Sequence, residues 1–187
     1  MRVVAGTYRG RVLGTLRGRA LRPTSDRLRE TLFDILGSTV VGSTFADVYA
    51  GTGAVGIEAL SRGAREAIFI ERRAPAVELI RRNLTSLGIG AEADLLAMDA
   101  VRGLELLVSR QLHAHFLFVD PPYAATGEYE RALGFLDRSP LLAPKGLVIV
   151  EHLRRRAMPE QLETLERARV VEQGDAALSF YRLALAA

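Results

Sequence analysis

The chain has 187 residues, 49% hydrophobic and 25% charged, which is typical of one globular domain and excludes a disordered or fibrous protein. It has no cysteine, which excludes disulfides, thiolate metal sites and a cysteine nucleophile. No apolar run approaches the roughly 20 residues of a membrane span, and no signal peptide is recognisable. We therefore expect a cytoplasmic protein without a bound metal.

Positive charge is concentrated at the N-terminus. The net charge is +3, yet residues 1–30 contain eight arginines and only two acidic residues. Such a segment suggests a polyanionic partner, because guanidinium groups match the geometry of phosphates. The alternative is an ordinary solvated surface. The arginines that we expect to contact phosphate are Arg9, Arg11, Arg17, Arg19 and Arg22.

The first 24 residues are predicted to form a basic arm, and residues 25–187 a body, within a single domain over 1–187. In the arm, Arg2–Ala5 and Val12–Leu13 favour a small hairpin, which an arginine-rich loop follows. Pro23 disfavours a helix at the preceding residue, and apolar residues then recur at helical spacing up to Leu36.

From Thr44 onward, short apolar runs alternate with amphipathic stretches. The predicted strands are Phe45–Tyr49, Ala67–Ile70, Ala93–Ala97, Phe116–Val119 and Leu147–Val150. The predicted helices are Val55–Arg62, Ala74–Leu87, Val101–Arg110, Tyr129–Ser139 and Pro159–Leu165. This alternation indicates an α/β fold with a doubly wound, largely parallel sheet. Only five residues separate Arg169–Glu172 from Leu178–Leu183, too few for a helical crossover, so the last strand should be antiparallel.

A glycine-rich turn joins the first strand of the body to its helix. Gly51, Gly53 and Gly56 form the pattern GxGxxG, which allows a tight turn and close approach of a ligand. Glu71 ends the next strand, where a carboxylate can accept hydrogen bonds from both ribose hydroxyls. The pattern predicts a nucleoside-like cofactor, although glycines and a strand-end carboxylate also occur at tight turns that bind nothing.

Two further acids favour S-adenosylmethionine over a nicotinamide cofactor. Asp47 lies inside an apolar strand, where it can orient the turn or meet the ammonium group of the cofactor. Its alternative role is that of a core acid that holds a backbone amide. Asp99 follows the third strand and can accept from the adenine amine, or it can cap the helix over 101–110.

Asp120-Pro121-Pro122-Tyr123 follows a buried strand, at the edge where open α/β sheets bind ligands. A nucleobase amine is a poor nucleophile because its lone pair is delocalised into the ring. The Asp120 carboxylate and the Pro121 carbonyl can accept its two N–H groups and turn that lone pair toward an electrophile. The prolines stiffen the turn, and Tyr123 offers a face on which an extruded base can stack. The alternative is a proline-rich turn capped by Asp120, with Tyr123 in packing.

Three segments, Arg22–Phe33, Asp47–Ala64 and Asp120–Tyr123, together resemble the RsmD family of bacterial methyltransferases of small-subunit ribosomal RNA. The resemblance extends to Ala177–Arg182, and Arg22–Phe33 is its most specific part. It implies a Rossmann-like class I S-adenosylmethionine-dependent methyltransferase fold, with a mostly parallel seven-stranded sheet, an antiparallel last strand and a small N-terminal β-hairpin extension.

The resemblance also implies an activity and a set of site residues. The activity is methylation of the exocyclic N2 of one guanine in 16S ribosomal RNA, within the small subunit or its assembly intermediate, with S-adenosylhomocysteine as product. We expect a monomer. The predicted catalytic residues are Asp120, Pro121, Pro122 and Tyr123. The predicted cofactor-binding residues are Asp47, Tyr49, Gly51, Thr52, Gly53, Glu71, Arg72, Asp99 and Ala100. The predicted RNA-binding residues are Arg9, Arg11, Arg17, Arg19, Arg22, Thr24 and Arg27.

Three other functions compete with this interpretation. A DNA or RNA adenine-N6 methyltransferase would use the same four residues as Asp120–Tyr123, but the chain has no room for a separate target-recognition domain. A nicotinamide-dependent oxidoreductase explains the glycine pattern and leaves Asp120–Tyr123 unexplained. A non-catalytic RNA-binding assembly factor is disfavoured because the site residues are intact.

Overall fold

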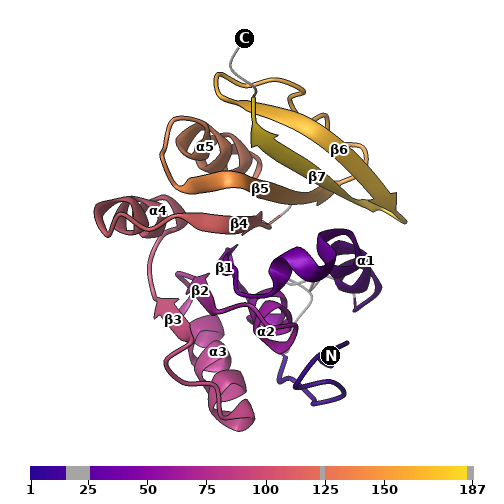
Figure 1. Cartoon of the computed structure of the whole chain (residues 1–187), viewed down its shortest axis with the longest axis vertical. Coiled ribbons are helices and arrows are strands. Elements are labelled where there is room, and N and C mark those ends of the chain that lie inside the picture. The colour runs from indigo at the N-terminus through magenta and orange to yellow at the C-terminus, as the bar shows by residue number, and fades with distance from the viewer. Residues whose placement is uncertain (16–25, 123–124, 185–187) are drawn as a thin grey trace. The chain divides into compact units, whose positions relative to one another are not determined.

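The computed structural model describes residues 1–15, 26–122 and 125–184. Contacts divide the chain into two compact units, Met1–Ala100 and Val101–Ala187 (Figure 1). The single domain over 1–187 stays a prediction. The predicted site residues Arg17, Arg19, Arg22, Thr24 and Tyr123 lie outside the described residues.

The first unit contains a three-stranded parallel sheet in the order β3-β2-β1. Its strands are β1 (Thr44–Val48), β2 (Glu66–Ile70) and β3 (Ala93–Leu96), and its helices are α1 (Asp26–Leu36), η1 (Gly37–Val40, a 3-10 turn), α2 (Ala54–Ser61) and α3 (Ala74–Leu87). The strands and helices predicted here are confirmed within a few residues at each end. Because the strands are parallel and in register, their carboxyl ends meet at one edge.

The core of the first unit forms where β2 meets α2 and α3. Phe69, Ile57 and Ile80 have no exposed surface. A Cβ at Gly56 would lie 2.4 Å from the ring of Phe69, so only glycine lets α2 approach β2 this closely. The third glycine of the pattern therefore serves helix–strand packing.

The N-terminal segment packs on the same core. Val3 and Leu13 are each 2% exposed and join this cluster. The predicted hairpin is present as one isolated antiparallel bridge between Arg2 and Val12, without extended strands.

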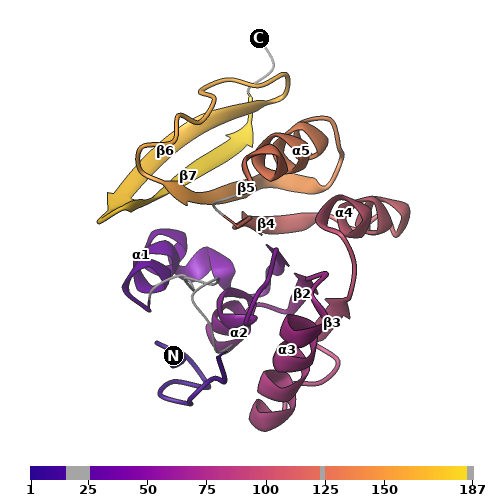
Figure 2. The same ribbon diagram turned by 180° about the vertical axis from the view of Figure 1, so that it is seen from behind.

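The second unit contains a four-stranded sheet in the order β4-β5-β7-β6. Its elements are α4 (Ala100–Ser109), β4 (Ala114–Val119), α5 (Thr126–Asp137), β5 (Leu142–Leu153), β6 (Leu165–Gln173) and β7 (Ala176–Leu183). β4 and β5 are parallel, whereas β7 is antiparallel to both β5 and β6. Figure 2 shows β6 and β7 side by side as a long hairpin. The predicted antiparallel last strand is confirmed, with a turn at Gly174, whose φ is +62°.

The helix predicted over Pro159–Leu165 is wrong. This stretch is an irregular turn that leads into β6, with a bridge between Gln161 and Glu166. The carboxylate of Asp137 accepts the backbone N–H groups of residues 163, 164 and 165 at 2.9, 2.7 and 2.9 Å. These backbone N–H groups therefore have their acceptor in a side chain at the end of α5, and not in the carbonyl groups of a helix of their own. Among the described residues, no helix is long and apolar enough to cross a membrane.

Candidate active site

The turn after β1 has the backbone conformation that its glycines suggest. Gly51 and Gly53 have φ angles of +56° and +77°, in the left-handed region that favours glycine. Tyr49 has a φ of +68°, which is an outlier for a bulky residue. A Cβ placed on Gly51 would meet only the Tyr49 carbonyl oxygen, at 3.9 Å. The turn therefore leaves open space beside Gly51 for a ligand to approach the backbone.

Glu71 ties this turn to the end of β2. It follows β2 directly and is 7% exposed. Its Oε2 accepts the N–H of Gly51 at 3.0 Å, and its Oε1 accepts the N–H of Arg73 at 2.8 Å. A carboxylate has about four acceptor positions, so two backbone donors leave room for hydroxyl donors of a ribose. Glu71 thus combines a structural role with the capacity for the predicted one.

Asp47 is a buried acid that holds the start of α2. It is 2% exposed, and its Oδ2 accepts the N–H of Gly56 at 2.9 Å. Gly56 lies in the first turn of α2, where backbone N–H groups have no partner inside the helix. The negative charge also lies at the positive end of the helix dipole. This contact matches the alternative role of a core acid, and it orients the glycine turn.

Arg72 and Asp99 come together at the same edge of the first unit. Arg72 Nη1 lies 3.6 Å from Asp99 Oδ2, and Asp99 is the more shielded partner of the two. Each follows the end of a parallel strand, β2 or β3. Ala100 is buried and begins α4, and Thr52 is buried within the turn. The predicted cofactor-binding residues of this unit therefore share the carboxyl edge of its sheet.

Asn83 is a residue of this region that sequence reasoning missed. It lies in α3 and is 3% exposed. Its Nδ2 donates to the Thr52 carbonyl at 3.0 Å, and its Oδ1 accepts the N–H of Gly14 at 2.8 Å. Asn83 thus joins the glycine turn to the N-terminal segment. The signal was an amide on the apolar face of a helix, three residues after Ile80.

In the second unit, the Asp120 turn follows β4. Asp120 is half-buried, Pro121 is buried and Pro122 is exposed. The Pro122 carbonyl accepts the N–H of Ala125 at 2.8 Å, immediately before α5. The turn is therefore stiffened by its prolines and connected by hydrogen bond to the start of a helix.

Exposed arginines lie in the described part of the basic arm and at the start of α1. Arg9, Arg11 and Arg27 are all exposed, and Arg11 Nη2 donates to the Ser86 carbonyl at 2.9 Å. Arg29 differs, because it is fully buried against Glu58. Glu58 is not among the predicted site residues, and the signal for its burial was a glutamate inside an apolar helix.

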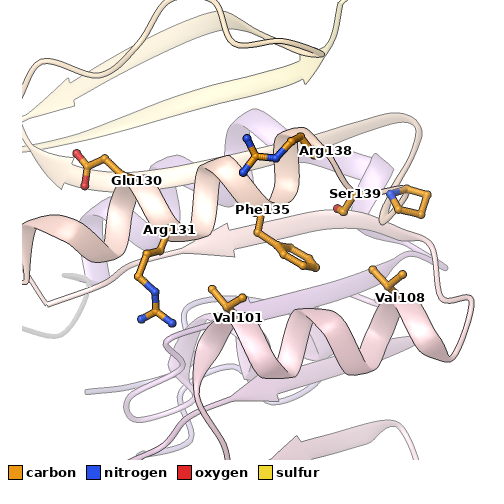
Figure 3. Close-up of a pocket in the computed structure, with 8 residues that line it drawn as sticks. Val101, Val108, Glu130, Arg131, Phe135, Arg138 and Ser139 are labelled. Carbon is orange, nitrogen blue, oxygen red and sulfur yellow. The ribbon is translucent and has the colours of Figure 1, made fainter.

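A groove lies between α4 and α5 in the second unit, and none of the predicted site residues that the structure describes lines it (Figure 3). Its volume is about 570 Å³, and Val101, Val108 and Phe135 form its apolar wall. Among the residues described, no group of three potential metal ligands is close enough to hold an ion.

Comparison with known proteins decides the family. The family model described as "Conserved hypothetical protein 95" matches residues 1–182. Ribosomal RNA small subunit methyltransferase D of Escherichia coli strain K12 is 35% identical over 159 residues, which are 85% of this chain and 78% of that protein. The chain belongs to this family, RsmD. Membership confirms the predicted resemblance and the predicted enzyme class of methyltransferase.

Solved structures confirm the fold of this RsmD-family protein. An Escherichia coli structure has a TM-score of 0.83 and 29% identity, covering 98% of this chain and 97% of that one. A protein solved in complex with S-adenosylhomocysteine has a TM-score of 0.64 and 13% identity, covering 83% of this chain and 48% of that one. At this identity the second likeness concerns the fold alone. The fold is therefore the Rossmann-like class I methyltransferase fold.

Proposed function

We propose that this RsmD-family protein transfers a methyl group from S-adenosylmethionine to the exocyclic N2 of one guanine in 16S ribosomal RNA, within the small subunit or its assembly intermediate. The observation that carries the proposal is family membership over nearly the whole chain. The site residues proposed below are supported by their positions at the carboxyl ends of parallel strands.

The first unit would hold the cofactor. Open space beside Gly51 admits a ligand to the backbone, and Glu71 retains acceptor positions for ribose hydroxyls. Asp99, held by Arg72, would accept from the adenine amine. S-adenosylmethionine supplies a methyl carbon activated by the sulfonium, so the protein mainly contributes proximity and alignment. The other predicted cofactor-binding residues follow, or lie near, the carboxyl ends of β1, β2 and β3.

The Asp120 turn would hold the base. The Asp120 carboxylate and the Pro121 carbonyl would each accept one N–H of the guanine amine, and Tyr123 would stack on the ring. The N2 lone pair then forms the new N–C bond as the C–S bond breaks, which releases S-adenosylhomocysteine. The amine loses one proton, for which Asp120 is the nearest proposed acceptor.

The N-terminal arm and the start of α1 would contact RNA phosphates. Arg9, Arg11 and Arg27 are exposed, as phosphate contact requires. Reversing the charge of Arg9 and Arg11 should weaken binding to small subunits and reduce the slope of log K against log salt. Reversing Arg102 and Arg110, two exposed arginines outside the arm in sequence, makes the same charge change and serves as the control. An equal loss of binding affinity in both double variants would mean that the arm is an ordinary solvated surface.

The decisive experiment is methylation of small subunits purified from cells that lack this gene. We expect transfer of labelled methyl groups, with N2-methylguanosine found by mass analysis of the digested RNA. Asp120→Ala should lose most of the transfer while its affinity for S-adenosylhomocysteine, measured by calorimetry, changes little. Asp175→Ala, an exposed aspartate in the β6–β7 turn, is the control. Methylation of DNA or appearance of N6-methyladenosine would overturn the proposed substrate.

A further inference from the structure

Tyr129 carries a buried hydroxyl that has no hydrogen-bond partner among the described residues. The side chain belongs to α5 and is 2% exposed. A buried polar group without a partner destabilises the folded protein, so natural structures keep few of them and each asks for an explanation. Nothing in the packing of α5 requires a hydroxyl here, since phenylalanine has the same ring.

The surroundings hold this ring in place and keep its hydroxyl protonated. The guanidinium of Arg156 lies 4.1 Å from the ring centroid, and Arg156 is itself held by Glu130 at 2.6 Å. Burial, and then the negative charge of Asp120, raise the pKa of Tyr129 well above its usual value, while Arg156 opposes the shift and Glu151 and Glu130 add to it. The group is therefore a neutral donor.

Tyr129 is also connected to the turn that carries Asp120. The N–H of Ala125 donates to the Pro122 carbonyl at 2.8 Å, and the N–H of Glu128 donates to the Ala125 carbonyl at 3.0 Å. Two successive backbone hydrogen bonds thus link Pro122 to the residue before Tyr129. The start of α5, which carries Tyr129, is therefore fixed by backbone hydrogen bonds to the proline turn that follows Asp120.

We propose that Tyr129 is a positioning residue for Asp120: its hydroxyl donates to the Asp120 carboxylate when a substrate amine engages that carboxylate. This inference rests on the proposed function of the Asp120 turn. A carboxylate has acceptor positions for both donors at once. The tyrosine donor fixes one orientation of the carboxylate, so that the remaining lone pairs meet the amine N–H.

The test compares Tyr129→Phe with Tyr181→Phe. Tyr181 is equally buried, but its hydroxyl donates to the Pro159 carbonyl at 2.8 Å, so it is a matched tyrosine with its partner already in place. Tyr129→Phe should melt at the same temperature as wild type or higher, with kcat lowered at least about fivefold. Its affinity for S-adenosylhomocysteine should be unchanged. Tyr181→Phe should melt lower with kcat unchanged.

A double-mutant cycle tests whether Tyr129 acts through Asp120. In an Asp120→Asn background, Tyr129→Phe should lower kcat no further. A wild-type kcat in Tyr129→Phe, or the same loss in both backgrounds, would overturn the inference. So would a lowered melting temperature, since it would mean that the hydroxyl already has its partner. These results are distinct from failure of the proposed function, which appears as absence of methyl transfer to small subunits by the wild-type chain.

Discussion

The guanidinium Nε of Arg29 lies 3.4 Å from Oε2 of Glu58, and neither side chain has any exposed surface. Both oxygens of Glu58 are engaged further, because they accept the backbone N–H groups of Val4 at 2.8 Å and Ala5 at 2.9 Å. The Arg29 side chain in turn donates to the carbonyl of Arg2. A buried ion pair between α1 and α2 thus holds the N-terminal segment.

Replacing Glu58 with glutamine should therefore be severe. It removes the buried counterion of Arg29, which keeps only the exposed Asp26 at 3.0 Å, and breaking such a buried pair costs about 3–5 kcal/mol. We expect the free energy of unfolding, measured by urea denaturation, to fall by that amount. Asp34→Asn removes an exposed partner of Arg62, at 3.6 Å, and should cost no more than about 1 kcal/mol. Equal effects of the two variants would contradict the structural role of Glu58.

Two glycines of the N-terminal segment should respond differently to alanine. Gly6 and Gly10 have nearly the same φ, +81° and +80°. A Cβ on Gly6 would lie 1.7 Å from the Ser61 carbonyl oxygen, whereas a Cβ on Gly10 would meet nothing within 4 Å. Both variants carry the cost of a left-handed alanine, of roughly 1 kcal/mol.

Gly6→Ala should lose clearly more stability than Gly10→Ala, because only the first must separate the segment from the end of α2. The measurement is the midpoint of urea unfolding for both variants beside wild type. Limited proteolysis should also cleave the first 15 residues faster in Gly6→Ala. Identical midpoints would mean that the segment does not pack on α2 in solution.

The contacts of Glu71 make a prediction about cofactor affinity. Glu71→Gln places an amide where two backbone N–H donors meet a carboxylate, so it disturbs the Gly51 turn and removes acceptors for ribose. We expect the affinity for S-adenosylhomocysteine to fall at least about tenfold, which is 1.4 kcal/mol. Glu78→Gln on α3, an exposed partner of Arg81, should bind normally in the same calorimetric titration. Normal binding by Glu71→Gln would remove this residue from the proposed cofactor site.

Asp137 should make stability depend on pH. Burial by itself would raise the pKa of this carboxyl, but the backbone N–H groups of residues 164, 163 and 165, with the Thr164 hydroxyl, outweigh it and lower the pKa below 3.8. Because the pKa is lower in the folded state, the stabilisation is present above pH 3.8 and is lost as pH falls through the folded-state pKa.

Asp137→Asn should accordingly lower the free energy of unfolding at pH 7 by about 2 kcal/mol, since hydrogen bonds to a charged acceptor are lost. The difference between variant and wild type should shrink as the pH is lowered below 3.8. Asp175→Asn, at an exposed turn, should follow wild type at every pH. A constant difference for Asp137→Asn would show that the charge itself is not what the three amides require.

The parts of the fold that the sequence could predict are those governed by local pattern. The apolar run of β2 and the glycines at 51 and 53 specify a buried strand and a left-handed turn without reference to distant residues. The apolar run of β2 also ends at Ile70, which predicts that Glu71 lies at the carboxyl edge of the sheet. Parallel pairing then follows from the alternation of strands and helices.

The contacts that it could not predict depend on residues far apart in the chain. The sequence predicts a helix over Pro159–Leu165, yet the Asp137 carboxylate accepts the backbone N–H groups of residues 163, 164 and 165. Glu58 and Asn83 likewise acquire their partners from the first 15 residues, 53 to 69 positions away. No local pattern contains that information.

The position of Asn83 also sets an order of events during synthesis. Gly14 cannot form its hydrogen bond until residue 83 has left the ribosome, and Val4 must wait for Glu58. The stretch around Gly14 is thus fixed later than Val4. A chain that ends before residue 83 would keep Val4 and Ala5 on Glu58, but it would leave Gly14 and the glycine turn without the Asn83 amide.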